Sequence, residues 1–366
     1  MKIGILTVPF NNNYGGFLQA YALKKALTDM GHDVVFINRR RNRKQGVKAT
    51  LRRVLVSCRL LKDRAAEKQA EISAYTNQFR SKYLEPVTRD YYTTKELRKS
   101  LKMGIDCFVV GSDQVWRYRY AKDSIDDFFF SFLKGTAIPR FSYAASVGTD
   151  EMEYSEDKLA VCKALLADFS AVSVRETSAA EMLATHFGCH RAKVVLDPTL
   201  LHDRQVYIDL FKDTYPKSDK KYMFTYILDE TEDKRENIGK IARAKDLDVM
   251  DVKAQKGNLS SQRIIEPVEK WLSGICYSDF VVTDSFHGIV FSIIFGRPFV
   301  AIGNEQRGLT RMSDLLSRLH LEHRLVASSA DVEKVIDQPI CWQSVSDAIL
   351  SERQQSLSFL NEALSI

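Results

Sequence analysis

The stretch KIGILTV at residues 2–8, followed by NNNYGG at 11–16, decides the fold of this chain. The first piece is apolar and rich in branched side chains, which is typical of a parallel strand buried on both faces. Residues 23–30 then repeat apolar side chains at helical spacing, and Gly31 stands where a helix C-cap is expected. A second apolar strand at 34–37 completes a βαβ unit, which predicts a doubly wound α/β sheet.

The same alternation of apolar strands and helical segments continues along the chain. The first unit is followed by DCFVV at 106–110, FSYAASVG at 141–148, AVSVRE at 171–176 and KVVLDPT at 193–199. After a polar segment typical of a linker, TYPKSDKK at 214–221, a second set consists of YMFTYIL at 222–228, LDVM at 247–250, FVVTDS at 280–285 and FVAIG at 299–303.

The length of 366 residues exceeds what one ordinary core accommodates. We therefore expect two Rossmann-like domains that face each other across a cleft, formed by residues 1–212 and 213–344. Residues 345–366 are predicted to form a helix that packs back on the first domain. Residues 39–83 are expected to be a helical insertion in the first domain, with one helical stretch over 63–83.

Composition and cysteine usage favour an ordinary globular protein of a reducing compartment. Hydrophobic residues make up 45% and charged residues 27% of the chain. The short apolar run from Ile3 to Phe10 is followed by asparagines and lacks a cleavage pattern, so we interpret it as a strand rather than a signal peptide. The six cysteines form no CxxC pair, which favours buried free thiols over disulfides or zinc. A cytoplasmic location is therefore expected.

The net charge of +6 is concentrated in one segment. Residues 39–64 hold eleven Lys/Arg and one acid, so the segment carries +10 and the rest of the chain −4. Within it, residues 47–61 place apolar side chains at helical spacing. Two interpretations stay open: a basic amphipathic helix on an anionic membrane surface, or a solvated basic face. No nucleic-acid motif accompanies the segment, so nucleic acid is not expected as a partner.

In an open parallel sheet, ligands bind beyond the carboxyl ends of the strands, and two polar loops occupy such positions early in the chain. The loop at 11–16 offers backbone N–H groups to an anion, or is simply a tight turn. GSDQVW at 111–116 presents Ser112, Asp113 and Gln114 to a ligand, or caps the next helix.

Two further strand ends carry a cation and a histidine. Arg175 directly follows an apolar strand, where it either clamps a carboxylate or phosphate or pairs with Glu176 or Asp197. In VVTDSFHGIVFSIIFGRP at 281–298, a strand runs into a long apolar helix. His287 thus stands at a helix N-terminus, where it binds a phosphate or transfers a proton, or is a packed turn residue behind a Ser285 cap.

Taken in order, these motifs resemble the polysaccharide pyruvyl transferase family. The resemblance rests on NYGG at 13–16, GSDQVW at 111–116, SVRE at 173–176, LDPT at 196–199 and TDSFHG at 283–288. NYGG together with FLQAYAL at 17–23 is similar to a subgroup found near bacterial surface-polysaccharide pathways.

The resemblance implies a glycosyltransferase-B-like (GT-B) fold and a transferase that moves a pyruvyl group from phosphoenolpyruvate onto a sugar as a ketal. It implies a lipid-linked acceptor at the inner face of the plasma membrane. No metal is expected, because the sequence shows no cluster of ligands at metal spacing, and no cofactor is expected besides the donor substrate. By motif match, Arg175 would bind an anion and His287 would be catalytic, and His287 or Asp113 is expected to supply the catalytic proton. The implied substrate-binding residues are Arg175, Asn13, Tyr14, Gly15, Ser112, Gln114, Asp197, Ser285, Gly288 and Arg307.

One departure and two rival functions accompany this interpretation. Many family members carry an arginine where this chain has Ser285, and Arg297, Arg307 or Arg311 would have to replace that cation. One rival is a nucleotide-sugar-dependent glycosyltransferase, in which Glu266 or Glu269 would hold the ribose. The other rival is a non-catalytic sugar- or anion-binding homologue. The sequence indicates neither the acceptor sugar nor the oligomeric state.

Overall fold

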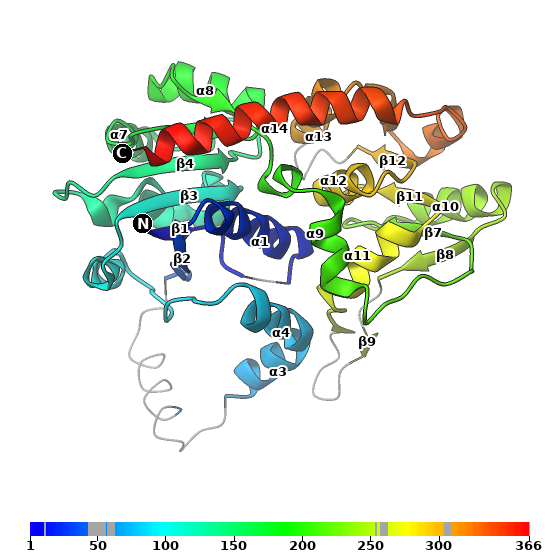
Figure 1. Ribbon diagram of the computed structural model, residues 1–366, viewed down its shortest axis with the longest axis horizontal. Coiled ribbons are helices and arrows are strands. Elements are labelled where there is room, and N and C mark those ends of the chain that lie inside the picture. Colours follow the sequence, from blue (N-terminus) through cyan, green and yellow to red (C-terminus); the bar gives the residue numbers. More distant parts are fainter. Residues whose placement is uncertain are drawn as a thin grey trace.

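Two parallel β-sheets, each covered by helices, form the two lobes of the molecule (Figure 1). The computed structural model describes residues 1–10, 12–42, 56, 63–252, 255–256, 263–303 and 309–365. The basic amphipathic segment predicted at 47–61 therefore lies outside the described residues, apart from Val56.

The N-terminal lobe is built on a six-stranded sheet in the order β2-β1-β3-β4-β5-β6, in which all pairs are parallel. Its strands are β1 (Lys2–Leu6), β2 (Asp33–Phe36), β3 (Cys107–Asp113), β4 (Arg140–Ala145), β5 (Ser173–Val174) and β6 (Lys193–Val194). Its helices include α1 (Tyr14–Asp29), α5 (Thr94–Leu97), α6 (Tyr118–Ala121), α7 (Glu156–Leu166) and α8 (Thr177–Phe187). Strand order reverses between β1 and β3, and this switch point is where a doubly wound sheet opens a site.

The C-terminal lobe repeats this plan with five parallel strands in the order β13-β12-β11-β7-β8. The strands are β7 (Tyr222–Tyr226), β8 (Asp248–Asp251), β11 (Phe280–Thr283), β12 (Phe299–Ile302) and β13 (Leu325–Val326). The helices are α10 (Glu232–Ala244), α11 (Val268–Tyr277), α12 (Phe286–Ile294) and α13 (Leu309–Arg318). The order reverses between β7 and β11, so the second switch point carries the TDSFHG motif.

Helices α9 (Arg204–Phe211) and α14 (Trp342–Leu364) join the lobes. Helix α14 begins beside the C-terminal lobe and runs across to the N-terminal lobe (Figure 1). There Ser356 Oγ accepts a hydrogen bond from the Leu196 N–H at 2.9 Å, and Arg353 Nη1 pairs with Asp203 at 2.7 Å. Buried side chains of both lobes also belong to one continuous hydrophobic cluster, for example Tyr207 against Phe291 with 5.0 Å between the ring centroids.

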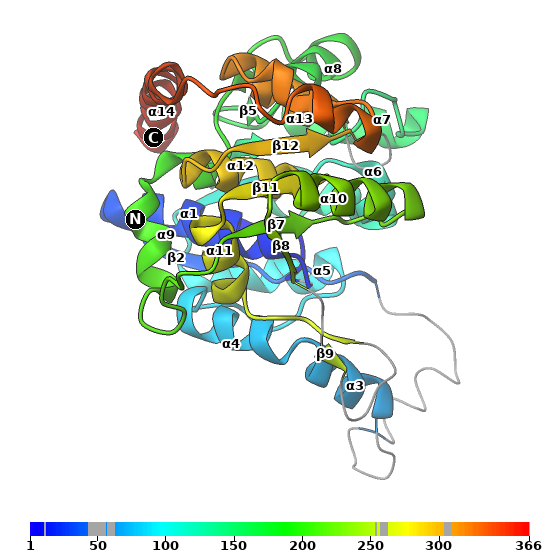
Figure 2. The same cartoon turned by 90° about the vertical axis from the view of Figure 1, so that its right-hand side faces the viewer.

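The insertion in the N-terminal lobe reaches the C-terminal lobe (Figure 2). Residues 63–83 were predicted to form a single helical stretch. The structure instead has two helices, α3 (Arg64–Ile72) and α4 (Ala74–Tyr83), because the helix is interrupted at Ser73. The N–H of Ile265 donates to the Ile72 carbonyl at 3.0 Å, beside the short strands β9 (Gln255–Lys256) and β10 (Arg263–Ile264).

Several sequence predictions need correction at their edges. The strand predicted over 193–199 ends at Val194, because Asp197 instead caps a short 3₁₀ turn at Pro198–Leu201. Cys341 is exposed, contrary to the expected burial, whereas Cys107, Cys162 and Cys276 are buried free thiols. Among the described residues, no helix combines the length and apolar character needed to cross a membrane.

Candidate active site

The two switch points meet where His287 packs on the backbone of Gly15. Helix α1 begins at Tyr14 with Asn13 as its N-cap, and helix α12 begins at Phe286 with Ser285 as its N-cap. A Cβ atom added to Gly15 would lie 2.0 Å from His287 Nδ1, so only glycine permits this approach. The positive ends of two helix dipoles therefore converge on one histidine ring.

Arg175 lies at the end of β5, in the same buried region, and is only 4% exposed. Its Nη1 atom is 2.7 Å from Asp197 Oδ2, its Nη2 is 3.5 Å from Asp113 Oδ1, and its Nε is 3.8 Å from Glu176 Oε2. Burial disfavours the charged guanidinium, but the three carboxylates prevail and raise the pKa of Arg175. The Asp197 pairing allowed by the sequence is thus present. Nε and Nη2 nevertheless have no hydrogen-bond partner among the described residues.

Asp197 connects this arginine with His287 across the lobes. Its Oδ2 atom accepts the bond from Arg175 Nη1 and lies 3.7 Å from His287 Nε2. Its Oδ1 accepts two hydrogen bonds from Thr199, at 3.0 Å from the backbone N–H and 2.6 Å from the hydroxyl. Burial opposes ionisation, but the neighbouring His287 ring and the Arg175 charge hold the pKa of Asp197 well below its usual range. His287 Nε2, by contrast, has no hydrogen-bond partner among the described residues.

Phe286 lies beside two guanidiniums. The Cζ atom of Arg175 is 4.4 Å from the ring centroid, and the Cζ atom of Arg311 is 5.6 Å from it. Burial, followed by repulsion from Arg175, lowers the pKa of Arg311 to about 10. Of the other cations considered from the sequence, Arg297 is at the far end of α12, with Nη1 3.4 Å from the Ser278 carbonyl. Arg307 lies outside the described residues.

The carboxyl end of β3 places Ser112, Asp113 and the following Gln114 in this region. The Ser112 hydroxyl lies 3.4 Å from Asp197 Oδ2 and 3.1 Å from the Ala144 carbonyl. Asp113 has a left-handed backbone with φ of 71° and is 6% exposed. The side-chain oxygen of Gln114 accepts a hydrogen bond from Arg117 at 3.0 Å.

Other motif residues support the lobes rather than face the His287 ring. Asn13 is exposed and accepts a hydrogen bond from the Gly15 N–H. Tyr14 is buried between the lobes, where its hydroxyl donates to the Glu266 carbonyl at 3.0 Å and its ring stacks on Trp271. Gly288 lies within α12, packed against Thr283.

Three contacts in the region were missed by sequence reasoning. Asp284 of TDSFHG is fully buried, accepts the Leu228 N–H at 2.6 Å and pairs with Lys234 at 2.9 Å, so it fixes the loop after β7. Phe286 lies beside two arginines, and Asp197 contacts both Arg175 and His287. These contacts too join segments that are distant in the sequence. The only available signal was that each residue belongs to a motif at a strand end.

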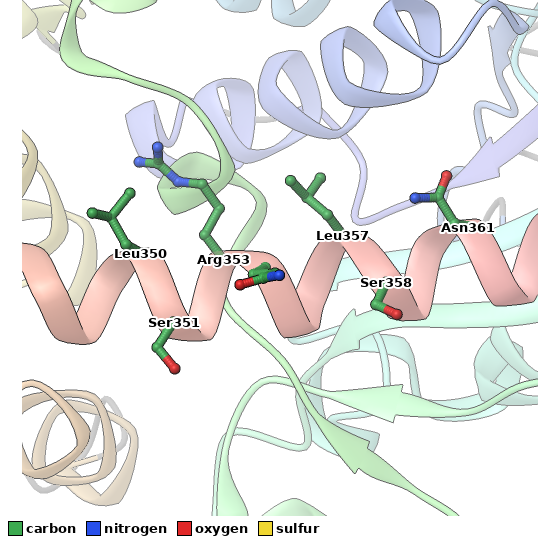
Figure 3. Close-up of a pocket in the computed structure, with 7 residues that line it drawn as sticks. Leu350, Ser351, Arg353, Leu357, Ser358 and Asn361 are labelled. Atoms are coloured by element: carbon green, nitrogen blue, oxygen red, sulfur yellow. The ribbon is translucent and has the colours of Figure 1, made fainter.

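Two cavities of the described structure lie elsewhere, since neither is lined by His287 or Arg175. One, of about 290 Å³, lies at the carboxyl edge of β7 and β8 beside α10. The other, of about 580 Å³, is an open groove along α14 that includes Leu350, Arg353 and Leu357 (Figure 3). No group of His, Cys, Asp and Glu among the described residues is placed to hold a metal ion.

Comparison with known proteins gives a family and a fold. A family model described as "Polysaccharide pyruvyl transferase" matches residues 13–306. Among solved structures, UDP-GlcNAc 2-epimerase from Neisseria meningitidis has 11% identity and a TM-score of 0.55, covering 100% of this chain and 99% of its own. The S. aureus MnaA–UDP co-structure has 14% identity and a TM-score of 0.55, covering 95% and 91%. Such identities show a shared GT-B fold alone. No curated protein sequence matches the chain.

Proposed function

This chain belongs to the polysaccharide pyruvyl transferase family, and from this premise we propose that it transfers a pyruvyl group from phosphoenolpyruvate to a sugar. The product is a pyruvate ketal on a surface-polysaccharide precursor. The observation that carries the proposal is the buried His287 ring beside Arg175 and Asp197, since its Nε2 has no hydrogen-bond partner in the part of the chain that the structure describes. A site that leaves polar donors unsatisfied when empty is suited to an anionic ligand.

Donor binding uses the unsatisfied groups of the cluster. The planar fork of Arg175 matches a carboxylate, and its Nε and Nη2 lack hydrogen-bond partners in the described structure. The N-terminus of α12 and the dipole of that helix favour a phosphate. Asp197 holds the arginine in place, because it accepts from Nη1 on one side and from Thr199 on the other.

The proposed chemistry balances with these residues alone. His287 or Asp113 gives a proton to the methylene carbon of the enol phosphate, which makes C2 electrophilic. A sugar hydroxyl attacks C2, and the C2–O bond to phosphate then breaks with its electron pair on the leaving phosphate. A second hydroxyl of the same sugar closes the ketal. Of the two protons released from the hydroxyls, one restores the catalytic acid and the other leaves with phosphate.

The acceptor is proposed to be a lipid-linked sugar at the inner face of the plasma membrane, with the enzyme bound peripherally. The support is the charge of +10 on residues 39–64, which would attract anionic lipids. Neutralising Arg52, Arg53 and Arg59 together should lower binding to vesicles that contain anionic lipid, measured by co-sedimentation. Unchanged binding would remove the membrane part of the proposal.

The direct test of the reaction compares two histidine variants. With labelled phosphoenolpyruvate and a membrane fraction as the acceptor source, His287→Ala should reduce label transfer by about 100-fold or more, since a general acid typically contributes 10²–10⁴-fold. His186 is exposed on α8, so His186→Ala is the matched control and should retain activity. Near-normal transfer by His287→Ala would refute the assignment. Sugar transfer from a nucleotide-sugar donor instead would favour the glycosyltransferase rival.

A further inference from the structure

Two arginines from different lobes are buried beside one aromatic ring. Arg175 comes from the N-terminal lobe and Arg311 from helix α13 of the C-terminal lobe, with 4% and 6% of their surfaces exposed. Their guanidinium carbons lie 4.4 Å and 5.6 Å from the Phe286 centroid. Phe286 is the first residue of α12, so both cations border the N-terminus of that helix.

Burying two like charges near each other is unfavourable, and the lowered pKa of Arg311 reflects that burial and the neighbouring Arg175 charge. The cluster also holds three carboxylates, those of Asp113, Glu176 and Asp197. All three also accept hydrogen bonds from other donors, and Asp113 Oδ1 accepts from the Gln114 N–H at 2.9 Å. Glu176 Oε1 accepts from the Ser146 hydroxyl and from two backbone N–H groups, and Asp197 Oδ1 accepts from Thr199.

The charge balance decides how many cations an anionic ligand needs. With two guanidiniums against three carboxylates, the cluster has no positive excess when His287 is neutral. Arg175 alone, already paired with Asp197 at 2.7 Å, offers a dianion little net attraction. Ser285, which caps α12, adds no charge. Arg311 is therefore the cation on which binding of a phosphate at this helix N-terminus depends.

We propose that Arg311 is the phosphate-binding cation of the donor site. In this arrangement Arg311 and the N-terminus of α12 hold the phosphate, Arg175 holds the carboxylate, and both guanidiniums contact the Phe286 ring. Because Arg311 belongs to the C-terminal lobe and Arg175 to the N-terminal lobe, a donor with both anionic groups bridges the lobes. The identity of the donor rests on the proposed function, whereas the phosphate site does not.

The test measures calorimetric affinities of the full chain for phosphoenolpyruvate and for its two halves, inorganic phosphate and pyruvate. Arg311→Gln should weaken binding of phosphate and of phosphoenolpyruvate by about 10-fold or more, the usual consequence of losing a charged hydrogen bond. Pyruvate affinity should stay unchanged. Arg243→Gln, which changes an exposed arginine on α10, is the matched control and should alter none of the three.

Three results would be decisive. Equal phosphate affinity in wild type and a folded Arg311→Gln variant would overturn the proposal, as would equal loss of phosphate and pyruvate binding. If Arg311→Gln does not fold, Arg311→Lys replaces it in the test. Lysine keeps the positive charge but lacks the planar guanidinium, so affinity for phosphate should fall while affinity for pyruvate stays unchanged. Phosphate binding that depends on Arg311, without any binding of phosphoenolpyruvate, would support the phosphate site and refute the proposed donor.

Discussion

The contact between His287 and Gly15 gives the sharpest prediction, since a single methyl group tests it. In Gly15→Ala the new Cβ would lie 2.0 Å from His287 Nδ1, whereas ordinary carbon contacts are about 3.5–4.0 Å. The ring or helix α1 must therefore shift by about 1.5 Å. Overpacking of this kind costs about 1–3 kcal/mol of stability, and a misplacement near 1 Å lowers turnover by about 100-fold.

Gly16→Ala is the matched control one residue along the same helix. Its Cβ would meet nothing nearer than Asn13 Nδ2 at 3.7 Å, which is an ordinary contact. Because alanine restricts the unfolded chain more than glycine does, this variant should gain about 0.4–1 kcal/mol of stability. Pyruvyl transfer and urea unfolding are measured for both variants. Turnover by Gly15→Ala equal to that of wild type would refute the placement of His287 against α1.

Three other variants test the surroundings of the cluster. Asp197→Asn removes the carboxylate nearest to the buried Arg175 charge and should destabilise the fold by about 3–5 kcal/mol in urea unfolding at neutral pH. The pKa of Asp197 is lowered in the folded state. The stability that this carboxylate contributes is therefore present above its unfolded pKa of about 4 and is lost as pH falls below that value. The difference in unfolding free energy between Asp197→Asn and wild type should accordingly shrink below pH ~4 and not above it. Tyr14→Phe removes the hydrogen bond to Glu266 and should cost about 1 kcal/mol in the same assay; no loss would mean that water replaces this bond. Cys341→Ser should remove one fast-reacting thiol from the native protein in a thiol-reagent titration, because Cys341 is exposed; an unchanged count would contradict that exposure.

Local sequence patterns were sufficient to predict the strands and helices that carry the site. The apolar run before TDSFHG predicted a strand, and β11 occupies Phe280–Thr283 with Ser285 as the helix cap. Gly31, expected to end the first helix, has a left-handed φ of 85°. Such signals are readable because caps and buried strands depend on neighbours within a few residues.

The arrangement within the site was not readable for the opposite reason. Gly15 and His287 are far apart in sequence, and their contact depends on how two lobes dock. Asp197 was predicted either to pair with Arg175 or to bind substrate, but it also lies beside His287 from the other lobe. Arg311 was one of three candidate cations, and only packing against Phe286 distinguishes it from Arg297.

The central claim, that phosphoenolpyruvate is the donor, is tested most directly by thermal unfolding with and without ligand. A ligand at ~100 times its dissociation constant adds about 2.7 kcal/mol to stability. We expect stabilisation by phosphoenolpyruvate, loss of that stabilisation in Arg175→Ala, and no effect of a panel of nucleotide-sugars. Stabilisation by a nucleotide-sugar alone would contradict it.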